Sequence, residues 1–246
     1  MIGFLSGRFF LLTRPHQQAE SLRRSMVAEG GECVVFPSIE IRALPVSSEN
    51  TPHTFSKIIF TSANAVEYSK NFLQNHSDDA NILAIGRGTE TALKKCGIHS
   101  AIPEKYSTEG LLTLPSLQSI RQEKIAIITG KNARPGLKEI LEQRGAVVSE
   151  IICYERICPQ YSEENISKIV QPHFDAIVSY SLESLKNLEV IFLNHLPWLK
   201  SQQFLVVTKE MRDYCSDQHF LKPAQLAEKV SDDAVLKVLC RLQDIA

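Results

Sequence analysis

The sequence has no paired cysteines, no long apolar run and no excess of one charge, and each absence excludes a class of protein. Its six cysteines occur without a CxxC pair, which argues against a zinc ribbon or a redox dithiol. The 27 Lys and Arg residues are balanced by 28 Asp and Glu residues, so no surplus of cations can bind a nucleic-acid backbone. Apolar runs such as IAII at 125–128 fall far short of the roughly 20 residues that a membrane span needs. We therefore expect neither nucleic acid nor a membrane as partner.

Familiar catalytic and cofactor motifs are absent as well. No GxSxG, HExxH or GxxxxGK[ST] occurs, which disfavours the common hydrolase, zinc and nucleotide sites. GRGT at 86–89 is only part of a dinucleotide fingerprint, because Thr91 stands where the third glycine belongs. The seven histidines are dispersed, so no metal cluster is expected. We expect a protein without cofactor or metal.

The N-terminal segment MIGFLSGRFFLLTR is apolar, yet it does not have the pattern of a signal peptide. Arg8 interrupts it, and no small-residue cleavage site follows. A strand suits this segment better, and we expect a cytoplasmic protein.

Short apolar runs alternate with longer segments of helical period, which is typical of βα units around a parallel sheet. The expected strands are 9–13, 33–37, 57–60, 81–86 and 124–129, and the expected helices are 15–29, 64–73, 87–97 and 135–145. Two further segments, IEIRALP (39–45) and VVSEIICYERI (147–157), alternate apolar and polar residues, and we expect them to pair as crossing strands. The polar segment PQYSEEN (159–165) is expected to be a turn.

The βα series repeat one another. FSKIIFTSANAV, from Phe55, aligns with FDAIVSYSLESL, from Phe174, and this alignment matches Ser62 with Ser181. NILAIG resembles QFLVVT, and RFFLLTRP resembles KIAIITGK. Two related domains explain these matches economically, although any two βα units look somewhat alike.

Polar or glycine-containing turns follow the strands, at TRP (13–15), TSAN (61–64), GRGT (86–89) and TGKN (129–132). Ligands of open α/β sheets bind at such strand ends, where helix starts present free amides that favour anions. Hydroxyls of Thr61, Ser62 and Thr89 can donate to the ligand, and Gly86 and Gly88 let the main chain approach it. The alternative for each residue is a helix cap.

These residues also form motifs of a known family. The motifs are LLTRP (11–15), FPSIEI (36–41), IIFTSANAV (58–66), LAIGRGT (83–89), STEGLL (107–112), IITGKNARPGLKEILEQRGA (127–146) and YER (154–156). Their order and spacing over about residues 9–160 resemble uroporphyrinogen-III synthase. The last third departs from the pattern, because the chain reads VVTKEMRD (206–213) where the family usually has a GxGT-like turn, and Thr208 is the hydroxyl left there.

The resemblance implies two similar Rossmann/flavodoxin-like α/β domains with parallel sheets, joined by a two-strand linker. Domain 1 would comprise 1–37 and 162–246, and domain 2 would be the insertion 46–153. The linker strands would be 38–45 and 154–161, where the two alternating segments lie.

The resemblance further implies a lyase of porphyrin and tetrapyrrole biosynthesis that cyclises hydroxymethylbilane in the cleft between the domains. We expect Tyr154 to be the general acid, because a phenol stays protonated at neutral pH and can donate a proton; the alternative is a linker aromatic that packs between domains. Arg14 and Arg156 would bind carboxylates or form structural ion pairs. The expected substrate-binding residues are Arg14, Thr61, Ser62, Ala63, Gly86, Gly88, Thr89, Ser107, Glu109, Gly110, Gly130, Ser181 and Thr208.

As partners the resemblance implies hydroxymethylbilane and a hand-over from hydroxymethylbilane synthase, and we expect a monomer. The main alternative is a non-catalytic two-lobed protein that binds small anions. A second alternative is an inactive interaction module of a tetrapyrrole-pathway assembly, which the divergent VVTKEMRD turn would fit.

Overall fold

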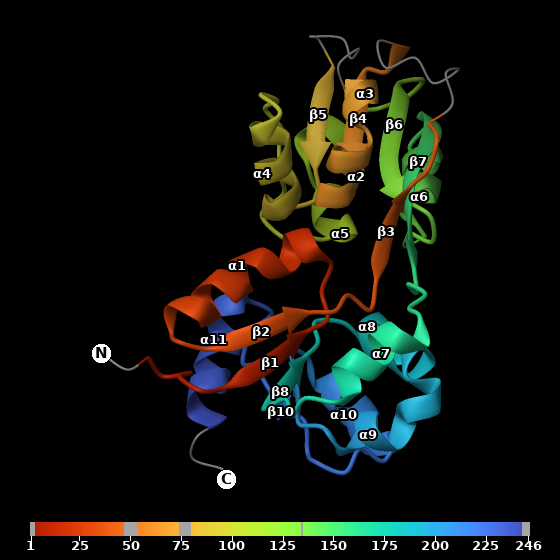
Figure 1. Ribbon diagram of the computed structural model, residues 1–246. Helices are drawn as coiled ribbons and strands as arrows, with labels where there is room; N and C mark the ends of the chain where they lie inside the picture. The colour runs from red at the N-terminus through yellow and green to blue at the C-terminus, as the bar shows by residue number, and fades with distance from the viewer. Residues whose placement is uncertain (1–2, 47–53, 74–79, 134, 243–246) are drawn as a thin grey trace. The chain divides into compact units, whose positions relative to one another are not determined.

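The computed structural model describes residues 3–46, 54–73, 80–133 and 135–242 (Figure 1). The chain divides into two compact units. Unit 1 consists of Met1–Glu40 and Ile157–Ala246, so both ends of the chain build it, and unit 2 is Ile41–Arg156.

Unit 1 contains a five-stranded sheet with strand order β10-β9-β8-β1-β2. Its strands are β1 Phe9–Leu12, β2 Glu32–Val35, β8 Ala176–Val178, β9 Phe204–Val206 and β10 Gln225–Leu226. Each neighbouring pair is parallel, and strand β1, between β8 and β2, places Phe10 opposite Cys33 of β2 and Ala176 of β8. Strands from the two ends of the sequence therefore lie side by side.

Helices cover both faces of this sheet. They are α1 His16–Ala28, α7 Glu163–Val170, α8 Leu182–Ile191, α9 Leu196–Ser201, α10 Lys209–Asp217 and α11 Asp232–Arg241, with a 3₁₀ turn η3 Leu193–His195. The connection from β1 leads to β2 at one edge of the sheet. The connections from β8 to β9 and from β9 to β10 lead toward the opposite edge. Right-handed crossovers then put α1 on the face opposite α8 and α10, and α11 packs beside α1.

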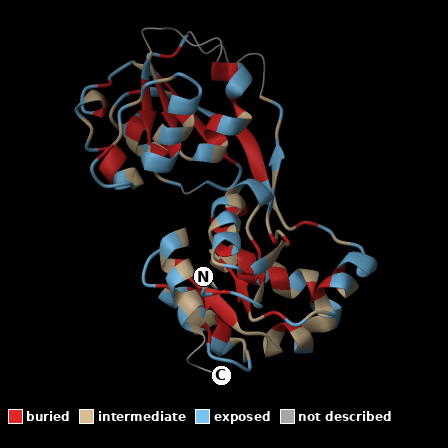
Figure 2. Cartoon of the chain, turned by 60° about the vertical axis from the view of Figure 1, so that its left-hand side comes forward, coloured by how far each residue is buried: buried red, intermediate tan, exposed pale blue. Residues whose placement is uncertain are grey.

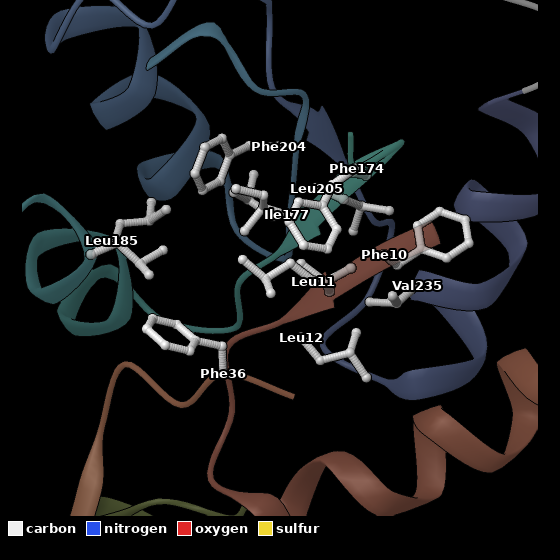
Figure 3. Close-up of a cluster of buried hydrophobic side chains, with 14 of the residues drawn as sticks. Phe10, Leu11, Leu12, Phe36, Phe174, Ile177, Leu185, Phe204, Leu205 and Val235 are labelled. Carbon is white, nitrogen blue, oxygen red and sulfur yellow. The ribbon is translucent and has the colours of Figure 1, made fainter. Parts of the chain in front are cut away.

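One hydrophobic core fills unit 1. The side chains in Figure 3 come from strands, helices and connecting segments far apart in sequence, including β1, β9, α8 and α11, and converge on the sheet. Phe10, Ile177, Leu185 and Val235 are fully buried there. Because both faces of the sheet are covered, its strands are continuous apolar runs rather than alternating ones.

Unit 2 contains a second five-stranded sheet with strand order β3-β7-β6-β4-β5. Its strands are β3 Glu40–Ala43, β4 Lys57–Phe60, β5 Asn81–Ala84, β6 Lys124–Gly130 and β7 Val147–Ile157. The pairs β5–β4, β4–β6 and β6–β7 are parallel, so these four strands end at the same edge of the sheet.

The helices of unit 2 enclose a separate core on each face of this sheet. They are α2 Ala63–Tyr68, α3 Lys70–Leu73, α4 Arg87–Lys95, α5 Thr108–Leu111 and α6 Leu137–Gln143, with a 3₁₀ turn η2 Pro115–Leu117. Side chains alternate between the cores as a pleated strand requires: Ile58 and Phe60 lie with α2, α3 and α4, whereas Ile59 lies with α5 and α6. Figure 2 shows the resulting pattern, with buried strands and helices that are exposed on one side.

The two units have corresponding topologies. Strands β9, β8, β1 and β2 occupy the same order in unit 1 as β5, β4, β6 and β7 in unit 2. The repeats in the sequence fall on equivalent elements, since β4 corresponds to β8, β5 to β9 and β6 to β1. The predicted fold class, two similar parallel-sheet α/β domains, is confirmed.

Local differences from the sequence-based expectations have physical causes. The helix expected over 64–73 is two helices, α2 and α3, separated at Ser69, whose hydroxyl donates to the Ala65 carbonyl at 2.6 Å. The segment 159–165, expected to be a turn, contains the start of α7, which Ser162 caps. Of the expected linker segments, 38–45 contributes β3 and 154–161 contributes the end of β7 to the sheet of unit 2.

Candidate functional site

The carboxyl ends of β4, β6 and β7 bring together four of the residues expected from the sequence. Thr61 and Ser62 follow β4, Gly130 ends β6, and Tyr154 lies near the end of β7. Ala63, the first residue of α2, is exposed beside them. These elements are distant in sequence and meet because parallel strands end at one edge.

Ser62 has two hydrogen-bond partners at this edge. Its Oγ accepts from the Ala65 amide at 3.0 Å and thereby caps α2. The same Oγ lies 3.0 Å from the Tyr154 hydroxyl. Thr61 is held separately, because its hydroxyl donates to Thr129 Oγ1 at 2.8 Å.

The Tyr154 side chain lies across strand β6. In the order β7-β6-β4, β6 separates Tyr154 from the turn after β4 that carries Ser62. The phenol ring lies over Gly130, where a Cβ would approach its Cε2 to 2.7 Å and overlap the ring. Tyr154 is only 5% exposed, and the Tyr68 ring lies 6.0 Å away. Glycine at 130 is therefore what allows the phenol to reach Ser62.

Glu155, next to Tyr154, was not expected as a site residue. It accepts from Arg42 of β3, whose Nε lies at 2.9 Å, and from Lys131 Nζ at 3.1 Å. The hydrogen bond from Arg42, together with that from Lys131, holds the pKa of Glu155 below its ordinary value. The sequence contains the three groups as Arg42 of IEIRALP, Lys131 of TGKN and Glu155 of YER, but no pattern in it pairs them.

The GRGT turn opens α4 at the end of β5. Gly86 is the N-cap and packs against Tyr106, whereas Gly88 is exposed and a Cβ there would meet nothing within 4 Å. Thr89 is buried, at 4% exposed. Gly88 thus has open space around it, and little of Thr89 reaches the surface.

The STEGLL segment forms the short helix α5. Ser107 caps it by accepting from the Gly110 amide at 3.1 Å. A Cβ at Gly110 would overlap the Lys105 carbonyl, so this glycine is required by the packing of its own turn. Glu109 is exposed in the first turn.

In unit 1, Arg14 follows β1 and contacts two groups. Its Nη1 lies 3.1 Å from Asp232 Oδ1, and its guanidinium lies 4.2 Å from the centre of the Tyr180 ring. The Tyr180 hydroxyl donates to the same Asp232 oxygen at 2.6 Å. Burial, with the Asp232 hydrogen bond, raises the pKa of Tyr180. The structural ion pair that the sequence left open for Arg14 is therefore formed.

Ser181 and Thr208, both expected as substrate-binding residues, cap helices in unit 1. Ser181 accepts from the Ser184 amide at the start of α8, and Thr208 accepts from the Met211 amide at the start of α10. Arg156, by contrast, is exposed on β7 in unit 2.

An open pocket of about 460 Å³ lies beside α10. Its lining residues are Leu182, Lys209, Glu210, Asp213, Tyr214 and Asp217. Three carboxylates face one amine, so this pocket is electrostatically unsuited to a polycarboxylate.

Within the described part of the chain, no helix is long and apolar enough to cross a bilayer.

Comparisons with known proteins agree with one another. The family model described as Uroporphyrinogen-III synthase HemD matches residues 20–237. A uroporphyrinogen-III synthase of Proteus mirabilis is 30% identical over 190 residues, which cover 72% of this chain and 96% of that protein. One of Salmonella typhimurium is 27% identical over 244 residues, covering 93% of this chain and 98% of that protein.

Solved structures show the same fold. The crystal structure of uroporphyrinogen-III synthetase from Helicobacter pylori superposes with a TM-score of 0.66 at 18% identity, covering 96% of this chain and 99% of that one. A mutant uroporphyrinogen III synthase from Thermus thermophilus gives a TM-score of 0.59 at 17% identity, covering 98% and 100% of the two chains. Because the family model spans most of the sequence, the chain belongs to the uroporphyrinogen-III synthase family.

Proposed function

We propose that the chain cyclises hydroxymethylbilane to uroporphyrinogen III, with inversion of ring D and loss of water. Membership of the family supports this activity. The chain also covers 98% of the length of the Salmonella typhimurium synthase. The enzyme is then a lyase of the tetrapyrrole pathway that leads to haem, sirohaem and cobalamin.

The reaction needs one proton to be delivered and one to be removed. Protonation of the terminal hydroxyl lets the carbon–oxygen bond break, water leaves, and the pyrrole nitrogen lone pair stabilises the electrophilic methylene. The substituted carbon of ring D attacks this methylene and forms a spiro intermediate, which fragments and recloses with the ring inverted. The carbon that closes the macrocycle then loses a proton, so that only water is lost overall.

The observation that carries the proposal is the Tyr154 hydroxyl, held 3.0 Å from Ser62 at the carboxyl edge of the unit 2 sheet. A phenol there can protonate the leaving hydroxyl and later recover a proton. Holding the two ends of one flexible molecule in reactive contact supplies a further part of the rate enhancement.

Binding of the substrate's carboxylates is proposed for the strand-end turns. Main-chain amides at the start of α4 favour anions, whereas the starts of α8 and α10 border the acidic pocket beside α10. The proposed binding residues are those expected from the sequence: Arg14, Thr61, Ser62, Ala63, Gly86, Gly88, Thr89, Ser107, Glu109, Gly110, Gly130, Ser181 and Thr208. Arg14 uses one nitrogen for Asp232, so it joins this set with its remaining donors.

The activity is tested by supplying hydroxymethylbilane freshly made by the preceding enzyme and separating the uroporphyrin isomers by chromatography. Without a synthase the bilane closes uninverted to isomer I, so the expected result is isomer III as main product. A protein that only binds small anions would leave isomer I as the product, and that result would contradict the proposal.

The role of Tyr154 is tested by Tyr154→Phe. We expect kcat to fall by about 10- to 100-fold, at the low end of general-acid effects because water can replace the donor, with isomer III still formed. Tyr214→Phe is the control. It also removes a tyrosine hydroxyl that forms a hydrogen bond, here with Glu189, but this tyrosine lies on α10 in unit 1. Full kcat in Tyr154→Phe would remove this residue from the mechanism.

We also propose a cytoplasmic monomer that receives the bilane from hydroxymethylbilane synthase. The cytoplasmic location is supported by the six cysteines, all free thiols, as is usual in a reducing compartment. The segments 38–45 and 154–161 are proposed to act as linker strands, a role compatible with the boundaries of unit 2 at Ile41 and Arg156.

A further inference from the structure

Ser62 is placed to control the Tyr154 hydroxyl. Its Oγ accepts the Ala65 amide at 3.0 Å, a bond that uses a lone pair and leaves the Ser62 proton available. The Tyr154 oxygen lies 3.0 Å away, within reach of that proton. The helix cap thus fixes the serine oxygen, and the serine in turn fixes the phenol.

The approach of the phenol from the other side is set by Gly130. The register of β6 and β7 shifts between Thr129 and Gly130, which places Gly130 opposite Tyr154. Because residue 130 has no side chain, the Tyr154 ring can lie over strand β6. Any larger residue at 130 would overlap the ring. The ring is also nearly buried, so its hydroxyl has little freedom to swing away.

We infer that Ser62 is a positioning residue that donates its hydroxyl proton to the Tyr154 oxygen, with Gly130 providing the passage for the ring. This inference rests on the proposed role of Tyr154 as general acid. With Ser62 as donor, the Tyr154 proton is free to point at the substrate rather than at the protein.

The proton transfer explains what this bond contributes. When Tyr154 protonates the leaving hydroxyl, the phenol O–H bond breaks, water departs and a phenolate remains. Ser62 then donates to a charged oxygen, and hydrogen bonds to charged groups are the stronger ones. The phenolate regains its proton from the ring-closing carbon, which restores the starting hydrogen bonds.

For the side chain of Ser62, this positioning role takes the place of the direct contact with a substrate carboxylate that its membership of the proposed binding set implies. A direct contact would act independently of Tyr154 and mainly affect KM. A positioning residue acts through the phenol, so its removal lowers kcat and has no further effect once the phenol hydroxyl is gone.

The experiment measures kcat, KM and the isomer ratio for Ser62→Ala, Ser62→Gly, Ser62→Thr, Tyr154→Phe and the double variant Ser62→Ala/Tyr154→Phe. We expect Ser62→Ala to lower kcat by about 3- to 30-fold, the effect of one hydrogen bond, with KM within about twofold. Ser62→Thr keeps both the cap and the hydroxyl and should restore most of the activity. The double variant should be no slower than Tyr154→Phe.

Loss of the helix cap is separated from loss of the hydroxyl by two variants. Glycine is tolerated at an N-cap nearly as well as serine, so Ser62→Gly should fold normally and match Ser62→Ala in kcat. Ser162→Ala removes an equivalent cap, on α7, and should leave kcat unchanged.

Three results would overturn the inference: normal kcat in both Ser62→Ala and Ser62→Gly, an effect confined to KM, or an equal further loss when Ser62→Ala is added to Tyr154→Phe. These results differ from failure of the proposed function. Isomer I as the wild-type product would refute the activity, and full kcat in Tyr154→Phe would refute the general acid.

Discussion

Glu155 is a nearly buried carboxylate that joins three segments of unit 2. It is 7% exposed and accepts hydrogen bonds from Arg42 of β3 and Lys131 of the turn after β6. Both cations are more than half exposed, so the pair is not sealed from water. Glu155 is next to Tyr154 on β7. The charge of the Glu155 carboxylate therefore helps to hold β3, β7 and the turn after β6 together at this edge of the sheet.

We predict that Glu155→Gln removes a pH-dependent part of the stability. Because the folded-state pKa of Glu155 is lowered, its contribution is fully present above the unfolded value of about 4.3 and is lost as the pH falls through the lower folded value. Urea unfolding of both proteins should therefore differ most above about pH 5 and converge at lower pH.

Glu150→Gln is the matched control for this prediction. Its ion pair with Lys138 is long, at 4.0 Å, and both side chains are exposed, so a smaller change is expected. A gap between wild type and Glu155→Gln that stays constant down to pH 3 would contradict the assignment of the effect to the Glu155 charge.

At the residue scale the sequence names candidate site residues but does not predict the contacts among them. Ser62 and Tyr154 both appear among the expected residues, yet they are 92 positions apart, and their hydrogen bond depends on the order of strands between them. Glu155 was missed because a single acid in YER resembles any charged surface residue. Tyr180 and Asp232, which engage Arg14, were missed because they lie far from Arg14 in the sequence and form no motif with it.

At the scale of elements, apolar runs predict the strands well and polar turns predict the helix starts. The runs at 9–13, 57–60, 81–86 and 124–129 coincide with strands β1, β4, β5 and β6. They are continuously apolar because both faces of each sheet are covered. Helix α7 was missed because Ser162 and the two glutamates after it read as a turn, whereas they form a cap and an acidic first turn. The break between α2 and α3 lies at Ser69, whose side chain bonds the Ala65 carbonyl. The spacing of apolar residues in this segment does not predict the break.

Two glycines, one in the first turn of α4 and one just after its last turn, give predictions of opposite sign. Gly88 lies in the first turn with open space around it, so Gly88→Ala should stabilise the protein by about 0.5 kcal/mol. Gly97 ends the helix at φ +78°, so Gly97→Ala should destabilise it by about 1 kcal/mol or more. Thermal unfolding monitored by circular dichroism measures both.

Kinetics of the same variants test whether the α4 turn meets the substrate. If a carboxylate approaches the main chain at Gly88, the added methyl group raises KM while the fold becomes more stable. Gly97→Ala, at the far end of α4, serves as the comparison and should leave KM unchanged. An unaltered KM in Gly88→Ala would take this residue out of the binding set.

At the scale of the whole molecule, no hydrophobic core among the residues that the structure describes is shared between the units, and we predict that the two units respond separately to mutation. Leu185 is buried in unit 1 and Leu93 in unit 2, and truncation of either to Ala should cost about 2–5 kcal/mol. The single tryptophan, Trp198, lies in α9 and therefore reports on unit 1 alone.

Guanidinium unfolding followed by Trp198 fluorescence and by far-UV circular dichroism distinguishes the unfolding of the two units. Leu185→Ala should shift the fluorescence transition, and Leu93→Ala should shift only part of the dichroism signal. Equal shifts of the fluorescence midpoint by both variants would mean that the chain unfolds as one cooperative body.

The internal repeats predict two related units, because matching segments such as those around Ser62 and Ser181 fall on equivalent strands and caps. They do not predict that unit 1 is discontinuous. That expectation came only from the family resemblance, because no local sequence pattern predicts that β1 pairs with β8, more than 150 residues later.

The pairing of β1 with β8 affects how the chain matures during translation. Leu12 leaves the ribosome well before its partner Val178, and at roughly 5–20 residues per second the delay is about 10–30 s. Unit 2 is contiguous and can assemble within that interval, while the apolar strand β1 waits without its central neighbour. Nascent chains should therefore gain protease resistance first in the middle of the polypeptide, and the first forty residues should be the part that recruits a holding chaperone.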